Sequence, residues 1–139
     1  MKFKKHESGY AVRLEKGEDV LVSLTRFANE VKLGSGSVIG IGVVCDVELG
    51  YFDPEANEYI KKNLDGEYEL ITFMGNFSVV DGERFVHAHV TVSDRDCRPY
   101  AGHLFSGVIG VTGEFTVTAS DVVITRSPDP DTGLKFLDL

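Results

Sequence analysis

The feature that most constrains this fold is a succession of strand-like segments from Ser37 almost to the end of the chain. Apolar and β-branched residues dominate SVIGIGVVCDVELGYFD (37–53), YIKKNL (59–64), EYELITFMGNFSVV (67–80), ERFVHAHVTVS (83–93), HLFSGVIGVTGEFTVTA (103–119) and VVITRS (122–127). Asp81-Gly82 between two of them is a pair that type I′ hairpin turns prefer, because both central residues need positive φ. Segments joined in this way predict a mostly antiparallel sheet.

One stretch ahead of these segments has a different period. After strand-like alternation at Ser8–Leu14, apolar residues recur every three or four positions, and Gly34 then supplies a stop signal. The residues are Val20, Leu21, Leu24, Phe27, Ala28 and Val31. They predict an amphipathic helix from about Glu18 to Lys32. The expected fold class is therefore α+β, a mostly antiparallel sheet with one main helix packed on it.

Length and composition bound the organisation of the chain. A chain of 139 residues with 42% hydrophobic and 26% charged residues predicts one globular domain, residues 1–139. No apolar run reaches membrane-spanning length, and MKFKKHESGY lacks the apolar segment of a signal peptide. We therefore expect a cytoplasmic protein with no membrane partner, in which Cys45 and Cys97 are free thiols.

Three of the four histidines lie in FVHAHVTVSDRDCRPYAGHL (85–104). His87 and His89 are two apart on a predicted strand, so their side chains share a face. If the loop DRDCRPYAG joins antiparallel neighbours, His103 lies opposite them to within about one residue of register. Three neutral imidazoles suit zinc or a similar divalent ion and leave a fourth position open. The alternative is a hydrogen-bonded polar patch, and loop residues could contribute to either: Asp94, Asp96 and Cys97.

Several blocks together resemble the plant-and-prokaryote conserved (PPC) domain family. The blocks are GEDVLVSLTRFA, GIGVV, GEYELITFMGNFSVVDGERFVHAHVTVSD and YAGHLFSGVIGVTGEFTV, and the resemblance runs from about Tyr10 to Leu137. In plants the domain accompanies an AT-hook in nuclear proteins, whereas this chain resembles the stand-alone prokaryotic form. The resemblance implies assembly as a homotrimer. It also implies that His87, His89 and His103 match the family's histidine positions, where some prokaryotic members hold a metal.

The resemblance supports partner contacts and DNA binding less strongly. GEYELI (66–71) matches a plant stretch implicated in protein contacts, but Glu67-Tyr68 stands where plants favour arginine and phenylalanine. No AT-hook core of the Arg-Gly-Arg-Pro type is present, and the net charge of −8 repels phosphates. Direct DNA binding is therefore not expected.

Three functions remain open from the sequence. The first is a homotrimeric PPC-domain binding or interaction module with a three-histidine divalent metal site, zinc being the first candidate, in a regulatory role. The second is a metal-dependent enzyme acting on a small molecule, for which Glu69 and Glu114 are the candidate proton acceptors because both lie on predicted strands. The third is a DNA-associated regulator that acts through a protein partner. No Ser/His/Asp triad, Walker loop or CxxC pair is present, so the binding module is favoured over the enzyme.

Overall fold

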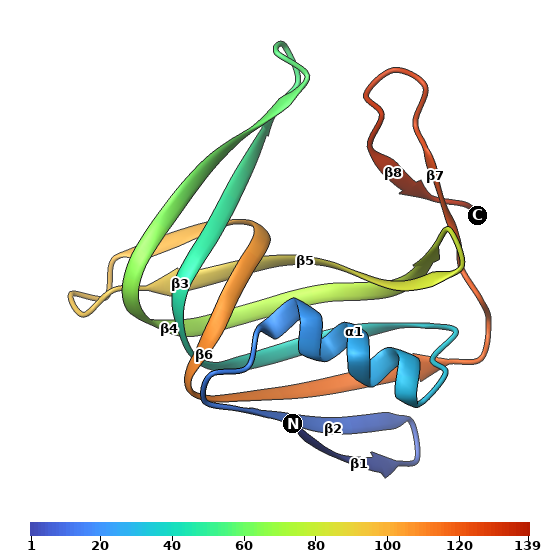
Figure 1. Ribbon diagram of the computed structural model, residues 1–139, viewed down its shortest axis with the longest axis horizontal. Helices are drawn as coiled ribbons and strands as arrows, with labels where there is room; N and C mark the ends of the chain where they lie inside the picture. The colour runs from blue at the N-terminus through green and yellow to red at the C-terminus, as the bar shows by residue number, and fades with distance from the viewer.

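The computed structural model describes residues 1–139 as one helix and eight strands (Figure 1). In chain order the elements are β1 (Lys2–His6), β2 (Gly9–Glu15), α1 (Val20–Glu30), β3 (Ser35–Asp53), β4 (Glu58–Val80), β5 (Glu83–Ser93), β6 (Pro99–Ser120), β7 (Arg126–Pro128) and β8 (Lys135–Leu137). The fold is α+β with a mostly antiparallel sheet, as the sequence predicts.

Six strands form the main sheet in the order β1-β2-β6-β3-β4-β5, and every pair in it is antiparallel. The first residues of β6, Pro99–His103, also pair with β5. Hydrogen bonding therefore runs round a closed circuit of β3, β4, β5 and β6, which brings β5 and β6 side by side. Strands β7 and β8 form a separate C-terminal hairpin.

Strands β3 and β4 are long, 19 and 23 residues, and bend instead of breaking. The register shifts between Cys45 and Val47, and Asp46 has a φ of 52°. A bulge of this kind bends a strand and increases its twist without ending the pairing. The far end of the β3–β4 pair, residues 50–63, consequently projects from the sheet as an arm (Figure 1).

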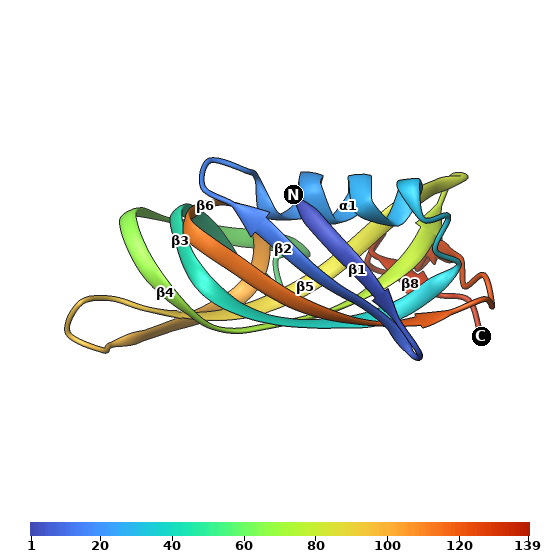
Figure 2. The ribbon, with the colours of Figure 1, turned by 90° about the horizontal axis from the view of Figure 1, so that it is seen from below.

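Helix α1 covers the concave side of the curved sheet (Figure 2). Asp19 caps it by accepting a hydrogen bond from the backbone N–H of Val22, 2.9 Å away. The helix buries Leu24 and Phe27 against a core that includes Phe73 and Phe115. These contacts confirm the amphipathic helix expected from the apolar period, although it is shorter than Glu18–Lys32. The opposite face of the sheet, which we call the outer face, carries no helix.

Three details differ from the sequence-based expectation. Residues 59–64 and 67–80 form one strand, β4, because the bulge at Asp46 absorbs the interruption at Asp65-Gly66. The strand expected over VVITRS is wrong in extent, since β7 covers only Arg126–Pro128 and Thr125 adds no more than an isolated bridge to Val79. The lysine-rich start forms an edge strand, β1, which was not expected. No helix of the protein is long and apolar enough to cross a membrane.

Candidate metal centre

The two histidines of β5 lie on the outer face of the sheet. Side chains alternate along a strand, so Val86, Ala88 and Val90 enter the core while His87 and His89 point the other way. The centroids of the two imidazole rings are 5.2 Å apart. The structure thus confirms that both rings share one face.

His103 reaches the same place from β6. Strands β5 and β6 pair in a register that sets His89 directly opposite His103, as the sequence predicted to within a residue. Asp94 shapes the chain reversal, because its carboxylate accepts hydrogen bonds from the backbone N–H groups of Asp96 and Arg98, both at 2.9 Å. The bond from Arg98 is the main reason why the pKa of Asp94 lies below its usual range.

The loop residues Asp94, Asp96 and Cys97 do not join the histidines. Asp94 is occupied by the turn, Asp96 forms an ion pair with Arg98 at 3.1 Å, and Cys97 is exposed with a φ of 59°. The cluster of possible metal ligands consists of the three histidines alone. These loop residues therefore shape the reversal that brings His103 to β5.

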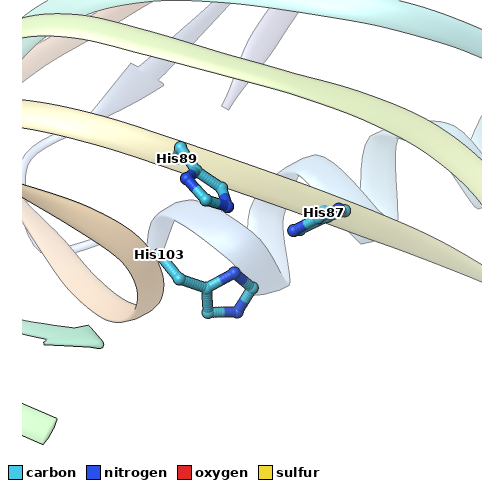
Figure 3. A group of neighbouring side chains, drawn as sticks. All are labelled: His87, His89 and His103. Atoms are coloured by element: carbon cyan, nitrogen blue, oxygen red, sulfur yellow. The ribbon is translucent and has the colours of Figure 1, made fainter. Parts of the chain in front are cut away.

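The three rings converge on a common space (Figure 3). Ring centroids are 5.1 Å apart for His87 and His103 and 5.4 Å apart for His89 and His103. One nitrogen of each ring lies within 4.8 Å of the other two. Tetrahedral bonds of about 2.0–2.1 Å place ligand atoms roughly 3.3 Å apart, so small side-chain rotations close the difference.

The local electrostatics keep two of these imidazoles neutral. Burial, and then the electrostatic cost of adding a proton close to His87, His89 and Lys61, lower the pKa of His103 to about 4. Burial, then Arg126 and His89, lower the pKa of His87. Neutral imidazole is the form that binds a metal, because protonation removes the free lone pair.

His103 shows that the residues present fit a divalent ion. Its Nδ1 is buried and has no hydrogen-bond partner in the protein, and it lies on the side of the ring that faces His87 and His89 (Figure 3). A buried polar atom without a partner is costly, and an ion held with His87 and His89 would satisfy it. Three histidine ligands leave one tetrahedral position open, where a bound divalent ion supplies a Lewis acid.

Four side chains around the histidines were missed by the sequence reasoning. Tyr59 and Phe105 pack on the His103 ring with centroid distances of 5.2 and 4.8 Å, and Lys61 lies beside Phe105. On the other side, Nη2 of Arg126 lies 3.4 Å from Nδ1 of His87. Phe105 follows His103 by two residues on β6, so strand alternation could have indicated it. The other three side chains reach the site only through the register of the bent β3–β4 arm and the return of β7, so no local motif could have indicated them.

The two glutamates proposed as proton acceptors lie elsewhere. Both are exposed on the outer face. Glu69 pairs with Val43 of β3, and Glu114 with Ile41 of β3 and Arg13 of β2. Neither belongs to the group of ligand atoms around the histidines. Their catalytic role stays a prediction, and their position outside the histidine cluster does not support it.

Comparison with known proteins gives the family. The sequence model of the Plants and Prokaryotes Conserved (PCC) domain, the same family as the PPC domain named above, matches residues 1–121. The chain belongs to this family. It is similar over 99% of its length to the crystal structure of a candidate DNA-binding protein from Bacteroides thetaiotaomicron, with 31% identity, 96% of that chain covered and a TM-score of 0.94.

Two further similar proteins are a solved structure and a curated sequence. A metal-containing protein from Archaeoglobus fulgidus is 32% identical, with both chains covered completely and a TM-score of 0.86. The curated relative named bifunctional protein GlmU, from Synechococcus sp. (strain JA-3-3Ab), is 32% identical over 133 residues, which make up 94% of this chain. This chain spans 20% of the length of such relatives.

Proposed function

We propose that this PCC-domain chain is a homotrimeric binding module that holds a divalent metal ion on His87, His89 and His103, with zinc the first candidate, for structure or for sensing a ligand in a regulatory role. The observation that carries the proposal is the buried, unpartnered Nδ1 of His103 facing two further imidazoles. The name of the Archaeoglobus relative, a metal-containing protein, supports it.

The metal part of the proposal has a direct test. Protein purified without a histidine tag is expected to contain about one divalent ion per chain by elemental mass spectrometry. His89→Ala should abolish this content, because two remaining imidazoles seldom hold zinc. His6→Ala is the matched control, since His6 lies on β1 and belongs to no cluster.

Removing the metal should also change stability. An ion that binds only the folded state stabilises it by about 2.7 kcal/mol at a free concentration 100 times its dissociation constant. Chelation is therefore expected to lower the melting temperature of the wild type and of His6→Ala, and to leave that of His89→Ala unchanged. A wild type without bound metal, whose melting temperature ignores both chelator and added zinc, would overturn the metal site.

The proposal of a trimer is supported by exposed apolar side chains on the outer face. Ile39, Ile41, Ile71 and Met74, which we call the apolar patch, are 55, 59, 51 and 59% exposed and line one continuous shallow hollow. Contiguous apolar surface of this kind marks interaction sites. We propose that other copies of the chain cover it, and light scattering should give a mass about three times 15.3 kDa.

The enzyme alternative rests on the open fourth position of a three-histidine site, which is typical of catalytic zinc. Such a reaction needs a proton acceptor within hydrogen-bond reach, and no carboxylate lies in the cluster. Binding is therefore favoured over catalysis. Turnover of ester, amide or phosphate substrates that is lost in His89→Ala would reverse this order.

A DNA-associated role is the second alternative, and the name of the Bacteroides relative is the observation that favours it. A net charge of −8 opposes direct contact with phosphates, so we propose that any such role passes through a protein partner. Tight, steeply salt-dependent binding of the purified protein to duplex DNA would contradict this.

A further inference from the structure

One row of paired residues connects the histidines with the arm. Across the strands, His89 of β5 pairs with His103 of β6, His103 pairs with Gly50 of β3, and Gly50 pairs with Lys61 of β4. Residues opposite one another on neighbouring strands point to the same face of a sheet. Lys61 therefore stands on the same face as the imidazoles.

Two aromatic rings form a wall beside Lys61 and the histidines. The rings of Tyr59 and Phe105 meet edge to face at 5.0 Å, and both contact the His103 ring. The ammonium of Lys61 lies 3.9 Å from the centroid of Phe105. Gly50 makes room for this wall, because a Cβ there would lie 2.4 Å from Cε2 of Phe105 and 3.0 Å from Cδ1 of Tyr59.

With a divalent ion bound, the site would carry an excess of positive charge. The three imidazoles are neutral ligands, and no carboxylate joins them, so a bound divalent ion keeps its full charge. Lys61 is paired with Glu48 at 3.0 Å, which leaves Arg126 as a further positive charge beside His87. Excess positive charge in a half-buried site favours an anionic ligand.

The donors that remain free suit a carboxylate better than a phosphate. Arg126 is committed to the protein, since it donates to Ser78, Asn76 and the backbone carbonyl of Lys135 at 2.7–2.8 Å. It thus offers no two-pronged grip for a phosphate. Lys61 gives one of its three N–H bonds to Glu48 and keeps two. An ammonium above an aromatic wall matches a small anion with an apolar body.

We propose that Lys61, Tyr59 and Phe105 form the receptor for a small carboxylate ligand of the three-histidine site. The carboxylate lies between the ammonium of Lys61 and the open position of the ion, and its apolar body packs on the two aromatic rings. This inference rests on the proposed metal function. It names the class of molecule that such a site would sense or act on.

The test uses cobalt, whose visible absorption reports ligand changes in a protein site. Full-length protein is loaded with Co²⁺, stoichiometric binding is established first, and benzoate is then added. Benzamide has the same shape without the charge and serves as the control ligand. Benzoate should change the absorption in a saturable way, while benzamide should leave it unchanged.

Two lysine variants then test the receptor. Lys61→Gln should weaken benzoate binding roughly three- to tenfold at low ionic strength, with Co²⁺ still bound. Lys62→Gln removes the same charge from the next residue of β4, which points to the opposite face and lies over the ring of Tyr100, so binding should be unchanged.

The possible failures are distinguishable. Loss of Co²⁺ binding in the wild type overturns the metal proposal and this one with it. Co²⁺ bound normally but indifferent to benzoate overturns the carboxylate receptor alone. An equal response to benzamide removes the role of charge, and equal weakening by Lys61→Gln and Lys62→Gln removes the specific role of Lys61; either result overturns the proposal.

Discussion

His103 combines a lowered pKa, a buried ring and a place in the proposed metal site. Its pKa of about 4 against an ordinary 6.5 means that the fold holds the ring neutral in a place where protonation is disfavoured. The same burial that disfavours a proton leaves Nδ1 without a partner. A proton and a metal ion thus compete for one lone pair, and the fold makes the proton the weaker competitor.

The depressed pKa of His103 predicts how the metal-free protein responds to acid. The unfolded chain takes up a proton near pH 6.5 and the folded chain only near pH 4, so stability is full above pH 6.5 and falls as the pH drops between these values. The loss should be about 1–3 kcal/mol. Urea unfolding of chelator-treated protein at pH 7, 6 and 5 measures it.

His103→Phe is the variant that isolates this effect, because a phenyl ring fits beside Tyr59 and Phe105 and cannot be protonated. Its stability should fall less between pH 7 and 5 than that of the wild type. Carboxylates with lowered pKa values, such as Glu18 and Asp94, lose their stabilisation mostly at lower pH. Identical slopes for variant and wild type would contradict the assignment to His103.

Gly50 allows a second prediction for a single residue. Gly50→Ala places a Cβ against the rings of Phe105 and Tyr59 and should destabilise the protein by about 1–3 kcal/mol through overpacking. Gly107→Ala is the control, since its Cβ would meet Val47 and Leu104 only at 3.6 and 3.8 Å, ordinary contact distances. Urea unfolding of both variants should separate them, and an equal cost would show that the aromatic wall yields freely.

At the scale of elements, the hairpin β7–β8 is attached to the sheet through Arg126. Its guanidinium donates to Ser78, which is 1% exposed, to Asn76 and to the carbonyl of Lys135. The side chain also lies over the ring of Phe85. One residue of a three-residue strand thus joins the C-terminal hairpin to β4 next to His87.

Arg126→Met should therefore loosen the C-terminal hairpin. The substitution leaves Ser78 and Asn76 unpaired, and a buried polar group without its partner costs about 1–3 kcal/mol. Amide hydrogen exchange at Val79 and Asp138, whose N–H groups bond to Ile124 and Thr125, should accelerate. Lys135→Met removes only an exposed ion pair with Asp81 and should change little; similar acceleration in both variants would contradict the role of Arg126.

The elements also show what sequence alone could supply. The hairpin at Asp81-Gly82 is confirmed, with φ of 52° and 86°, because a two-residue turn carries its own chemical signature. The convergence of His87, His89 and His103 followed from strand alternation and one short reversal. Lys61 and Arg126 could not be anticipated, since their positions depend on a bulge and on a hairpin far away in the chain.

At the scale of the whole molecule, the apolar patch adjoins the histidines. Met74 pairs with Ile39 on one side and with His89 on the other, so the proposed subunit contact and the proposed metal site are neighbours on the outer face. Met74 and Ile39 are both more than half exposed in the single chain. Assembly would therefore cover the approach to the histidines from this side.

Disrupting the apolar patch should dissociate the proposed trimer. Ile41→Glu buries carboxylates in the proposed subunit contact, where each costs several kcal/mol unless it is paired, so we expect monomers by sedimentation velocity. Val22→Glu is the control, because Val22 is 67% exposed on α1, away from the outer face, and its variant should remain trimeric. Trimeric Ile41→Glu would place the contact elsewhere.

The net charge adds a condition to this assembly. Three copies, each carrying −8, repel one another, so apolar contact has to exceed a repulsion that added salt screens. The proposed trimer should therefore dissociate more readily on dilution at low ionic strength than at about 0.15 M salt, where the Debye length is near 8 Å. Mass photometry over a dilution series at both salt concentrations measures this difference. Stronger association at low salt would instead indicate that ion pairs between opposite charges hold the copies together, and would move the expected contact from the apolar patch to the charged edge strand β1.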